Sequence, residues 1–202
     1  EMLRSLVGSE MCIRDRFQIV DSYVLTDREG RQIINTLVPY GTPLPMSGAP
    51  QDLNRVFETR APVLSHLFTG GVSRQPTIAL GVPVVRGDAV VYSLNVGLSP
   101  SRIGNALGRR ALPDGWVAAV LDSSGTIVAR TRDAARFVGQ KAVPTLAQAV
   151  QQESEGALET TTKEGTPVYT AFSRSALSGW TVAAGAPMTL LTTDLYRSIA
   201  WL

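Results

Sequence analysis

One hairpin pattern occurs in both halves of this 202-residue chain. Residues 27–30 read Asp-Arg-Glu-Gly between two apolar segments, and residues 122–125, Asp-Ser-Ser-Gly, repeat the arrangement. Asp can hydrogen-bond its own backbone in a turn and Gly accepts a positive φ, so each tetrapeptide predicts a tight turn between paired strands. The copies lie farther apart than the roughly 20–50 residues of solenoid repeats. The sequence therefore predicts two tandem copies of one small α+β module.

The first copy predicts strands rich in β-branched and aromatic residues, with one short helix between them. Asp52 is expected to be the N-cap of a helix that ends at Phe57. Residues 38–50 contain four prolines and predict an irregular covering loop. The expected strands are residues 19–26, 31–37, 61–68, 77–85 and 89–96, followed by a helix at 103–107.

The second copy repeats this order of elements. Its expected strands are residues 116–121, 126–130, 156–162, 166–173 and 180–184, with a connection at 137–140 and a helix at 144–151. When the two copies are aligned by their sequences, Pro83 to Gly97 in the first copy matches Pro167 to Gly185 in the second. Each copy is therefore expected to form a roughly five-stranded antiparallel sheet with short helices over one face.

Composition excludes several classes of protein. Hydrophobic residues make up 44% of the chain and charged residues 18%, which is too apolar for a disordered protein. The net charge of +2 comes from scattered basic residues, whereas a nucleic-acid-binding protein would show a basic patch or stripe. Cys12 is the single cysteine, so an intrachain disulfide is impossible, and the cytosol and the periplasm are both compatible with this composition.

The two ends of the chain need separate treatment. Residues 6–16 resemble a translated sequencing adaptor, with a genuine amphipathic helix as the alternative, and residues 1–16 are left out of the fold argument. Residues 188–202 carry a helical apolar stripe, and Arg197 and Trp201 near its end are typical of a helix that approaches a bilayer. The alternative for this segment is a C-terminal helix that docks on the protein itself.

Motifs for catalysis and for metal binding are absent from the sequence. His66 is the only histidine, and a zinc site needs three or four ligands. There is no Gly-x-Ser-x-Gly elbow and no glycine-rich phosphate-binding motif. The sequence therefore predicts no enzymatic activity, no metal and no cofactor for this fragment.

The second copy in particular resembles a known family. Its Asp-x-x-Gly hairpin, Phe-Val-Gly-Gln at 137–140, Ser-Gly-Trp at 178–180 and Gly-Ala-Pro at 185–187, with Val-Pro-Val at 82–84 in the first copy, are similar to double Cache sensor domains of bacterial transmembrane receptors. The resemblance covers residues 17–202. It implies a PAS-like membrane-distal module at 17–112, a membrane-proximal module at 113–188 and an exit helix at 189–202.

The resemblance also implies how such a protein works. The membrane-distal module of the family holds a small-molecule pocket, a long N-terminal helix packs along both modules, and the terminal helix relays ligand binding to a cytoplasmic output domain outside this sequence. The family's signature for amino-acid ligands is missing, because the first copy has no tryptophan. The second copy, with small residues at 183–185, is expected to be structural.

Alternation along the strand at 90–95 selects candidate ligand residues. Ser93 and Asn95 share its mixed face, while Tyr92 and Leu94 share an apolar face suited to the long helix. Thr77 is the polar candidate on the neighbouring strand. By the resemblance, Arg60, Ser65 and His66 lie where the family often supplies ligand contacts, and Arg60 would suit a carboxylate. For each of these residues a purely structural or solvated role is the alternative.

Together these observations predict the periplasmic ligand-sensing domain of a bacterial inner-membrane receptor, most typical of a sensor histidine kinase. It would bind a small polar or carboxylate ligand, form a homodimer and bind no nucleic acid. One alternative is the sensor of a chemoreceptor or a diguanylate cyclase. A second alternative is a soluble enzyme or a cytosolic PAS-like dimerisation module.

Overall fold

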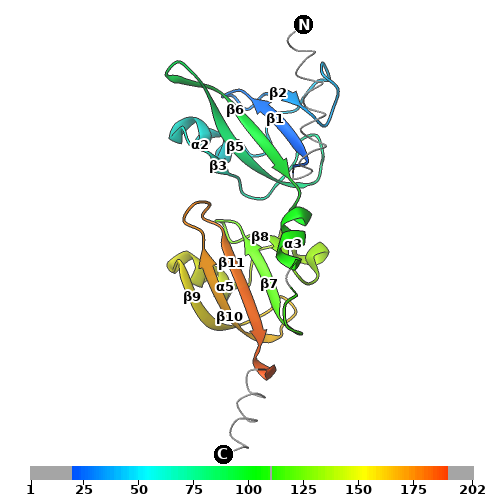
Figure 1. Cartoon of the computed structure of the whole chain (residues 1–202), viewed down its shortest axis with the longest axis vertical. Coiled ribbons are helices and arrows are strands. Elements are labelled where there is room, and N and C mark those ends of the chain that lie inside the picture. Colours follow the sequence, from blue (N-terminus) through cyan, green and yellow to red (C-terminus); the bar gives the residue numbers. More distant parts are fainter. Residues whose placement is uncertain (1–19, 110, 191–202) are drawn as a thin grey trace, which may run out of the picture. The chain divides into compact units, whose positions relative to one another are not determined.

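A computed structural model describes residues 20–109 and 111–190. The chain divides into two compact units, Glu1–Arg102 and Ile103–Leu202 (Figure 1). The division falls inside helix α3, Pro100–Gly108, ahead of the boundary that the sequence places at residues 112–113. Each unit is an antiparallel sheet with a few short helices, which confirms the α+β class.

The first unit is built on a sheet of six strands. Its order is β2-β1-β6-β5-β3, and β4 also pairs with β5. The elements are β1 Ser22–Thr26, β2 Gln32–Asn35, α2 Pro50–Thr59, β3 Val63–Leu64, β4 Phe68–Thr69, β5 Pro76–Arg86 and β6 Ala89–Leu98.

The second unit repeats this topology. Its five-stranded sheet has the order β8-β7-β11-β10-β9, in which strands take the same relative places as in the first unit. The elements are β7 Val117–Leu121, β8 Ile127–Arg130, α4 Ala134–Phe137, α5 Pro144–Gln152, β9 Glu155–Thr161, β10 Pro167–Arg174 and β11 Thr181–Pro187. The shared strand order confirms that the chain contains two copies of one module.

The two Asp-x-x-Gly segments form the same turn. Gly30 donates its N–H to the Asp27 carbonyl at 3.1 Å, and Gly125 donates to the Asp122 carbonyl at 2.9 Å. Both glycines have a positive φ, 84° and 77°, which only glycine adopts at little cost. The aspartate side chains close the turns, because Asp27 accepts from the Arg31 N–H and Asp122 from two backbone N–H groups.

Strand pairing fixes which residues correspond in the two units. Ser22 and Val117 stand at the same distance before the two turn aspartates, and they pair with Gly97 on β6 and Gly185 on β11. Gly97 and Gly185 are therefore equivalent, as the sequence alignment predicts.

The proline alignment is wrong, however. The two equivalent glycines pair with Ala79 on β5 and Thr170 on β10. Counting along the strands from these partners, Pro167 corresponds to Pro76 and not to Pro83. Both Pro76 and Pro167 begin their strands, a position where proline removes no ladder hydrogen bond. Pro83 instead lies inside β5, one residue ahead of the register shift at Val84.

Three local predictions are also corrected. Helix α2 begins at Pro50, with Ala49 as its N-cap, because proline suits the first turn, whose N–H groups lack helical partners. Asp52 is therefore not the N-cap. Residues 61–68 form two short strands instead of one, separated by Ser65 and its neighbours. Part of the expected connection at 137–140 belongs to the short helix α4.

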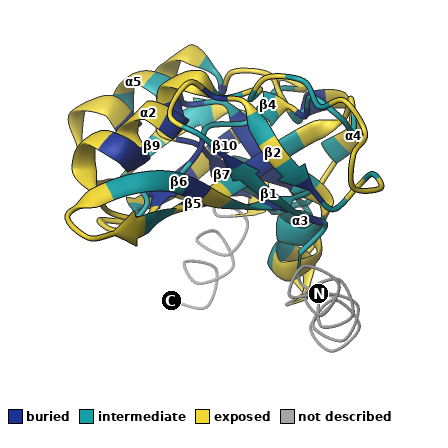
Figure 2. Cartoon of the chain, turned by 90° about the horizontal axis from the view of Figure 1, so that it is seen from above, coloured by how far each residue is buried: buried dark blue, intermediate teal, exposed yellow. Residues whose placement is uncertain are grey.

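The two faces of the first sheet differ in burial. On one face, Leu53, Val56 and Phe57 of α2 are buried, whereas the outward residues of α2 are exposed (Figure 2). The opposite face exposes large apolar side chains, including Leu80 and Leu94. This is the face that the sequence assigns to the long helix. The sequence carries the suspected adaptor tract in place of that helix, and this tract and residues 191–202 of the expected exit helix lie outside the described residues.

An ion pair between a buried arginine and a partly exposed glutamate stabilises the second unit. The Arg130 side chain is only 3% exposed and donates two hydrogen bonds to the Glu164 carboxylate, at 2.6 and 2.7 Å. Its guanidinium also lies 4.7 Å from the centre of the Phe137 ring. The hydrogen bonds from Arg130 hold the pKa of Glu164 down to about 2, against an ordinary value of 4.5. Glu164, in the β9–β10 turn, thus ties that turn to β8.

Replacing Glu164 with Gln is expected to lower the free energy of unfolding by about 1–3 kcal/mol at neutral pH, because Arg130 would stay buried without its counter-charge. The pKa of Glu164 is lower in the folded state, so its contribution is fully present above the unfolded value of 4.5 and is lost as pH falls through about 2. Denaturant titrations at about pH 7 and about pH 3 should show the wild-type advantage shrinking on acidification. Glu159→Gln, at an exposed position on β9, is the matched control and should change little. An advantage that is equal at both pH values would contradict this account.

Candidate ligand-binding site

A cavity of about 290 Å³ lies between α2 and the sheet of the first unit. The volume is close to the lower end of the roughly 300–1,000 Å³ typical of small-molecule sites. Two loops, around Ser47 and around Gly71, complete its wall. The strands and α2 contribute Ser22, Val24 and Thr26 from β1, Thr77, Ala79 and Gly81 from β5, Asn95 and Gly97 from β6, and Asp52, Leu53 and Val56 from α2.

Polar side chains on the floor of the cavity are held in a fixed network. The Asn95 amide donates to the carbonyls of Val24 and Ser93 and to the Thr26 hydroxyl, and its oxygen accepts from Ser93. Backbone carbonyls only accept, so they determine which end of the amide faces them. Thr26 and Ser93 are almost fully buried, at 2% and 0% exposure. Asn95 is therefore locked in place beneath the cavity.

Gly81 is where the sheet has no room for a side chain. A Cβ built there would lie 2.8 Å from Asn95 Oδ1 and 2.9 Å from Val56 Cγ2. Gly81 pairs with Asn95 across the sheet, so its missing side chain lets both α2 and the Asn95 amide approach β5.

The structure brings together three of the six residues selected from the sequence. Ser65, Thr77 and Asn95 line the cavity. Ser93 lies on the same face of β6 and supports Asn95 from below. Arg60 is the exposed C-cap of α2, with a left-handed backbone, and it is not among the cavity-lining residues. His66 does not line the cavity either, but it contacts a residue that does.

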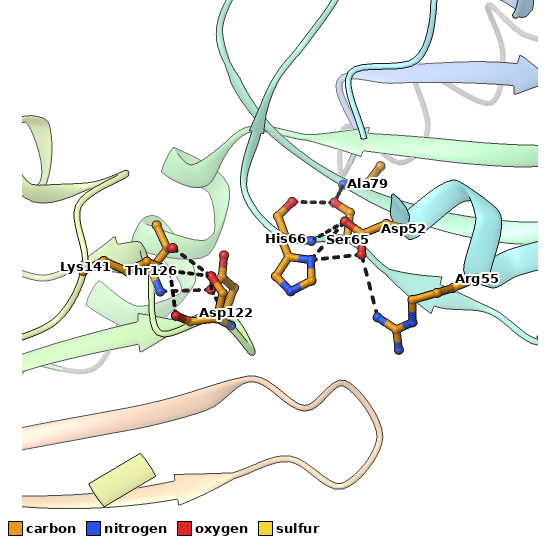
Figure 3. Close-up of polar contacts among 9 residues, drawn as sticks. Asp52, Arg55, Ser65, His66, Ala79, Asp122, Thr126 and Lys141 are labelled. Atoms are coloured by element: carbon orange, nitrogen blue, oxygen red, sulfur yellow. Dashed lines mark hydrogen bonds and ion pairs between the residues drawn. The ribbon is translucent and has the colours of Figure 1, made fainter. Parts of the chain in front are cut away.

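That residue is Asp52, whose carboxylate is bound to the segment after β3 (Figure 3). Asp52 accepts the His66 backbone N–H at 2.9 Å, and the His66 Nδ1 lies 2.9 and 3.1 Å from its two oxygens. Arg55, one turn further along α2, lies 3.7 Å away. Ser65 completes the junction, since its hydroxyl donates to the His66 carbonyl and accepts the Ala79 N–H. Asp52 thus joins α2 to the segment that leads into the cavity wall.

A second carboxylate, Asp21, closes the end of the cavity beside α3. It accepts hydrogen bonds from the Ser99 N–H and the Arg102 guanidinium. Partial burial acts to raise the pKa of Asp21, but these hydrogen bonds and the charge of Arg102 outweigh it and hold that pKa below its ordinary value. Asp21 therefore stays ionised and paired with Arg102.

Sequence reasoning missed the contribution of β1 and β2. Ser22, Thr26, Gln32 and Asn35 all line the cavity. The signal was available on β1, where Ser22, Val24 and Thr26 occupy alternate positions and so share one face. For Asp52 the sequence predicts a helix cap, whereas the structure places this residue in the cavity wall.

The equivalent space in the second unit is filled. Its cavity measures only about 60 Å³. Strand pairing, together with the proline that begins each helix, places bulky apolar residues where the first unit has small or polar ones. Leu121, Ile127, Leu146 and Phe172 take the places of Thr26, Gln32, Asp52 and Gly81. All four are buried in one hydrophobic cluster.

No protein-family model and no curated protein matches this chain. Solved structures do. The extracellular domain of the histidine kinase rpHK1S-Z16 superposes with a TM-score of 0.70 at 13% identity, over 90% of this chain and 76% of that one. The ligand-binding domain of the Pseudomonas aeruginosa PAO1 amino-acid chemoreceptor PctB, in complex with L-Arg, gives 0.63 at 12% identity, over 84% and 72%. An extracellular ligand-binding receptor from Desulfohalobium retbaense DSM5692 gives 0.63 at 22% identity, over 83% and 30%.

The chain has the double Cache fold. The matched structures are extracellular sensor domains of histidine kinases and chemoreceptors, so the resemblance seen in the sequence is confirmed at the level of the fold. Over the described part of the chain, every helix is too short or too polar to cross a bilayer. The same residues contain no group of three or more His, Cys, Asp or Glu side chains placed to hold a metal ion.

The close approach at Gly81 yields a test of the cavity floor. Gly81→Ala is expected to lower the free energy of unfolding by about 1–3 kcal/mol, because the new methyl group would push against Asn95 and Val56. Gly104→Ala in α3 is the control, since a Cβ there meets nothing within 4 Å. The control should be neutral or stabilising by up to about 1 kcal/mol, from helix propensity alone. Denaturant titration of both variants measures the difference, and equal stabilities would show that the floor is not tightly packed.

Proposed function

We propose that this chain is the extracytoplasmic sensor region of a bacterial transmembrane receptor and that it binds a small polar molecule in the first unit. The observation that carries the proposal is the contrast between the units. They share one backbone topology, yet the first encloses about 290 Å³ and the second about 60 Å³. The matched sensor domains of histidine kinases and chemoreceptors support the same conclusion.

The proposed ligand contacts are Ser65, Thr77 and Asn95, with Ser93 as the support of Asn95. Their hydroxyl and amide groups lie in a cavity whose exposed lining surface is mostly apolar. Such a combination of an apolar wall and a few fixed polar groups is typical of small-molecule sites. Arg60, which suggested a carboxylate ligand, is exposed at the end of α2 and has no place in this set.

For the output we favour a sensor histidine kinase located in the inner membrane, with this region in the periplasm and the receptor acting as a homodimer. The structure with a TM-score of 0.70 belongs to a histidine kinase and supports this choice. A chemoreceptor is the second candidate, because chemoreceptor sensor domains share the fold at similar scores. In either case the signal would leave through the segment that follows β11, where Met188 begins a helix. We assign no catalytic step to this region.

Ligand binding by the cavity can be tested with a thermal-shift screen of small polar molecules. A ligand at about 100 times its Kd should stabilise the native state by about 2.7 kcal/mol and raise the Tm. Ala79→Leu should abolish the shift, because its side chain would occupy the cavity that Ala79 lines. Ala171→Leu, on the exposed face of β10, makes the same chemical change outside the cavity and should leave the shift intact. Shifts that survive Ala79→Leu would place binding elsewhere and refute the proposed site.

A further inference from the structure

The charges around the cavity restrict what it can bind. Among the described residues, no lysine or arginine lines it, while Asp21 and Asp52 do. Asp21 is already paired with Arg102, which lies outside the lining. A carboxylate ligand would therefore lie against a wall that has no lysine or arginine and that carries the Asp52 carboxylate. Burying an unpaired charge near a like charge is costly, so this wall disfavours anions.

Three of the polar side chains on the wall, Ser65, Thr77 and Asn95, keep mainly acceptor capacity. The Ser65 hydroxyl proton is used on the His66 carbonyl at 2.7 Å, and the Thr77 hydroxyl proton on the Gln75 carbonyl at 2.9 Å. Both Asn95 amide protons are used on the floor, while its oxygen accepts a single bond, from Ser93. A hydroxyl oxygen and an amide oxygen each have two lone pairs. These three side chains thus keep acceptor sites after their protons have been used.

Asp52 adds the strongest acceptor. A carboxylate has about four acceptor sites when ionised, and His66 uses part of them through its backbone N–H and its ring, while the Arg55 guanidinium lies 3.7 Å from one oxygen. Asp52 is 7% exposed and lines the cavity, so its remaining capacity lies in a largely desolvated setting. Hydrogen bonds to a charged group in such a setting are stronger than neutral ones.

We infer that the ligand is a small amine or amide that presents N–H groups to Asp52, Ser65, Thr77 and Asn95 and carries no carboxylate. The inference rests on the proposed function and narrows the ligand of the same cavity. The size of the cavity, about 290 Å³, also favours a small ligand. The buried Ser22 hydroxyl, also in the lining, can serve a carbonyl or hydroxyl group elsewhere on the ligand.

The test uses matched sets of probes, each an amine, an amide and a carboxylate on one carbon skeleton, such as benzylamine, benzamide and benzoate. Binding of each probe to the whole chain is measured by thermal shift and calorimetry. Amines and amides should bind at least about tenfold more tightly than the matched carboxylates, given the usual strength of a hydrogen bond to a charged group. Ala79→Leu should remove this binding.

Asp52→Asn removes the charge and keeps an oxygen for the His66 N–H, so it should weaken amine binding by about tenfold or more. Asp27→Asn is the matched control, because Asp27 closes the first hairpin turn outside the cavity, and it should leave affinity unchanged. If Asp52→Asn does not fold, Thr77→Val removes one acceptor from the cavity with little change in shape and should weaken binding several-fold.

Two results would overturn the inference. In the first, carboxylates bind more tightly than the matched amines and amides, and this binding is lost in Ala79→Leu. The ligand would then be an anion, while the proposal that the cavity senses a small molecule would stand. Amine binding that is insensitive to both Asp52→Asn and Thr77→Val would show that these acceptor groups do not recognise the ligand. A complete absence of Ala79→Leu-sensitive binding by any probe would instead count against ligand binding by this cavity, and so against the proposed function itself.

Discussion

The pairing of Gly81 with Asn95 between β5 and β6 is the contact on which the cavity depends. Because Gly81 has no Cβ, the Asn95 amide and the α2 residue Val56 can both come close to the strand. In the second unit the same pair is Phe172 and Ala183, so the large side chain stands on the other strand. A phenyl ring at this position joins the hydrophobic cluster and fills the space. Together with Leu121, Ile127 and Leu146, this ring makes the sheet face of the second unit a packed core.

Polar residues on the floor make the hollow energetically acceptable. An empty cavity lined only by apolar groups forfeits packing contacts, whereas a polar floor can be hydrated until a ligand replaces the water. The buried polar groups of that floor need hydrogen-bond partners, and Thr26, Ser93 and Asn95 supply them to one another. The second unit needs no such network, because apolar residues take the corresponding positions. The two units therefore share one backbone topology but carry different side chains at equivalent positions, polar or small in the first and apolar in the second.

The sequence predicted the features that depend on local pattern. Alternation along 90–95 placed Asn95 and Ser93 on the polar face of the sheet, and the two Asp-x-x-Gly turns predicted the duplicated hairpins. What it could not predict depends on tertiary partners. The sequence predicts Asp52 as a helix cap, yet the residue lies inside the first turn of α2 and its carboxylate is bound to His66, fourteen residues away along the chain. The equivalence of Pro76 with Pro167 likewise follows only from strand register. From the sequence alone, Pro83 can be aligned with Pro167 just as well as Pro76 can.

The wall of the cavity is physically continuous with the start of α3. Asp21 and Ser99 both line the cavity, and Asp21 accepts hydrogen bonds from the Ser99 N–H and from Arg102 in the first turn of the helix. Helix α3 is the covalent connection between the units. A ligand shifts the equilibrium between two conformations of a protein only by the difference in its interactions with those two conformations. If the proposed ligand binds here, contacts near Asp21 would be the ones that connect occupancy of the cavity with α3, whereas Asp52 and Asn95 would contribute to the choice of ligand.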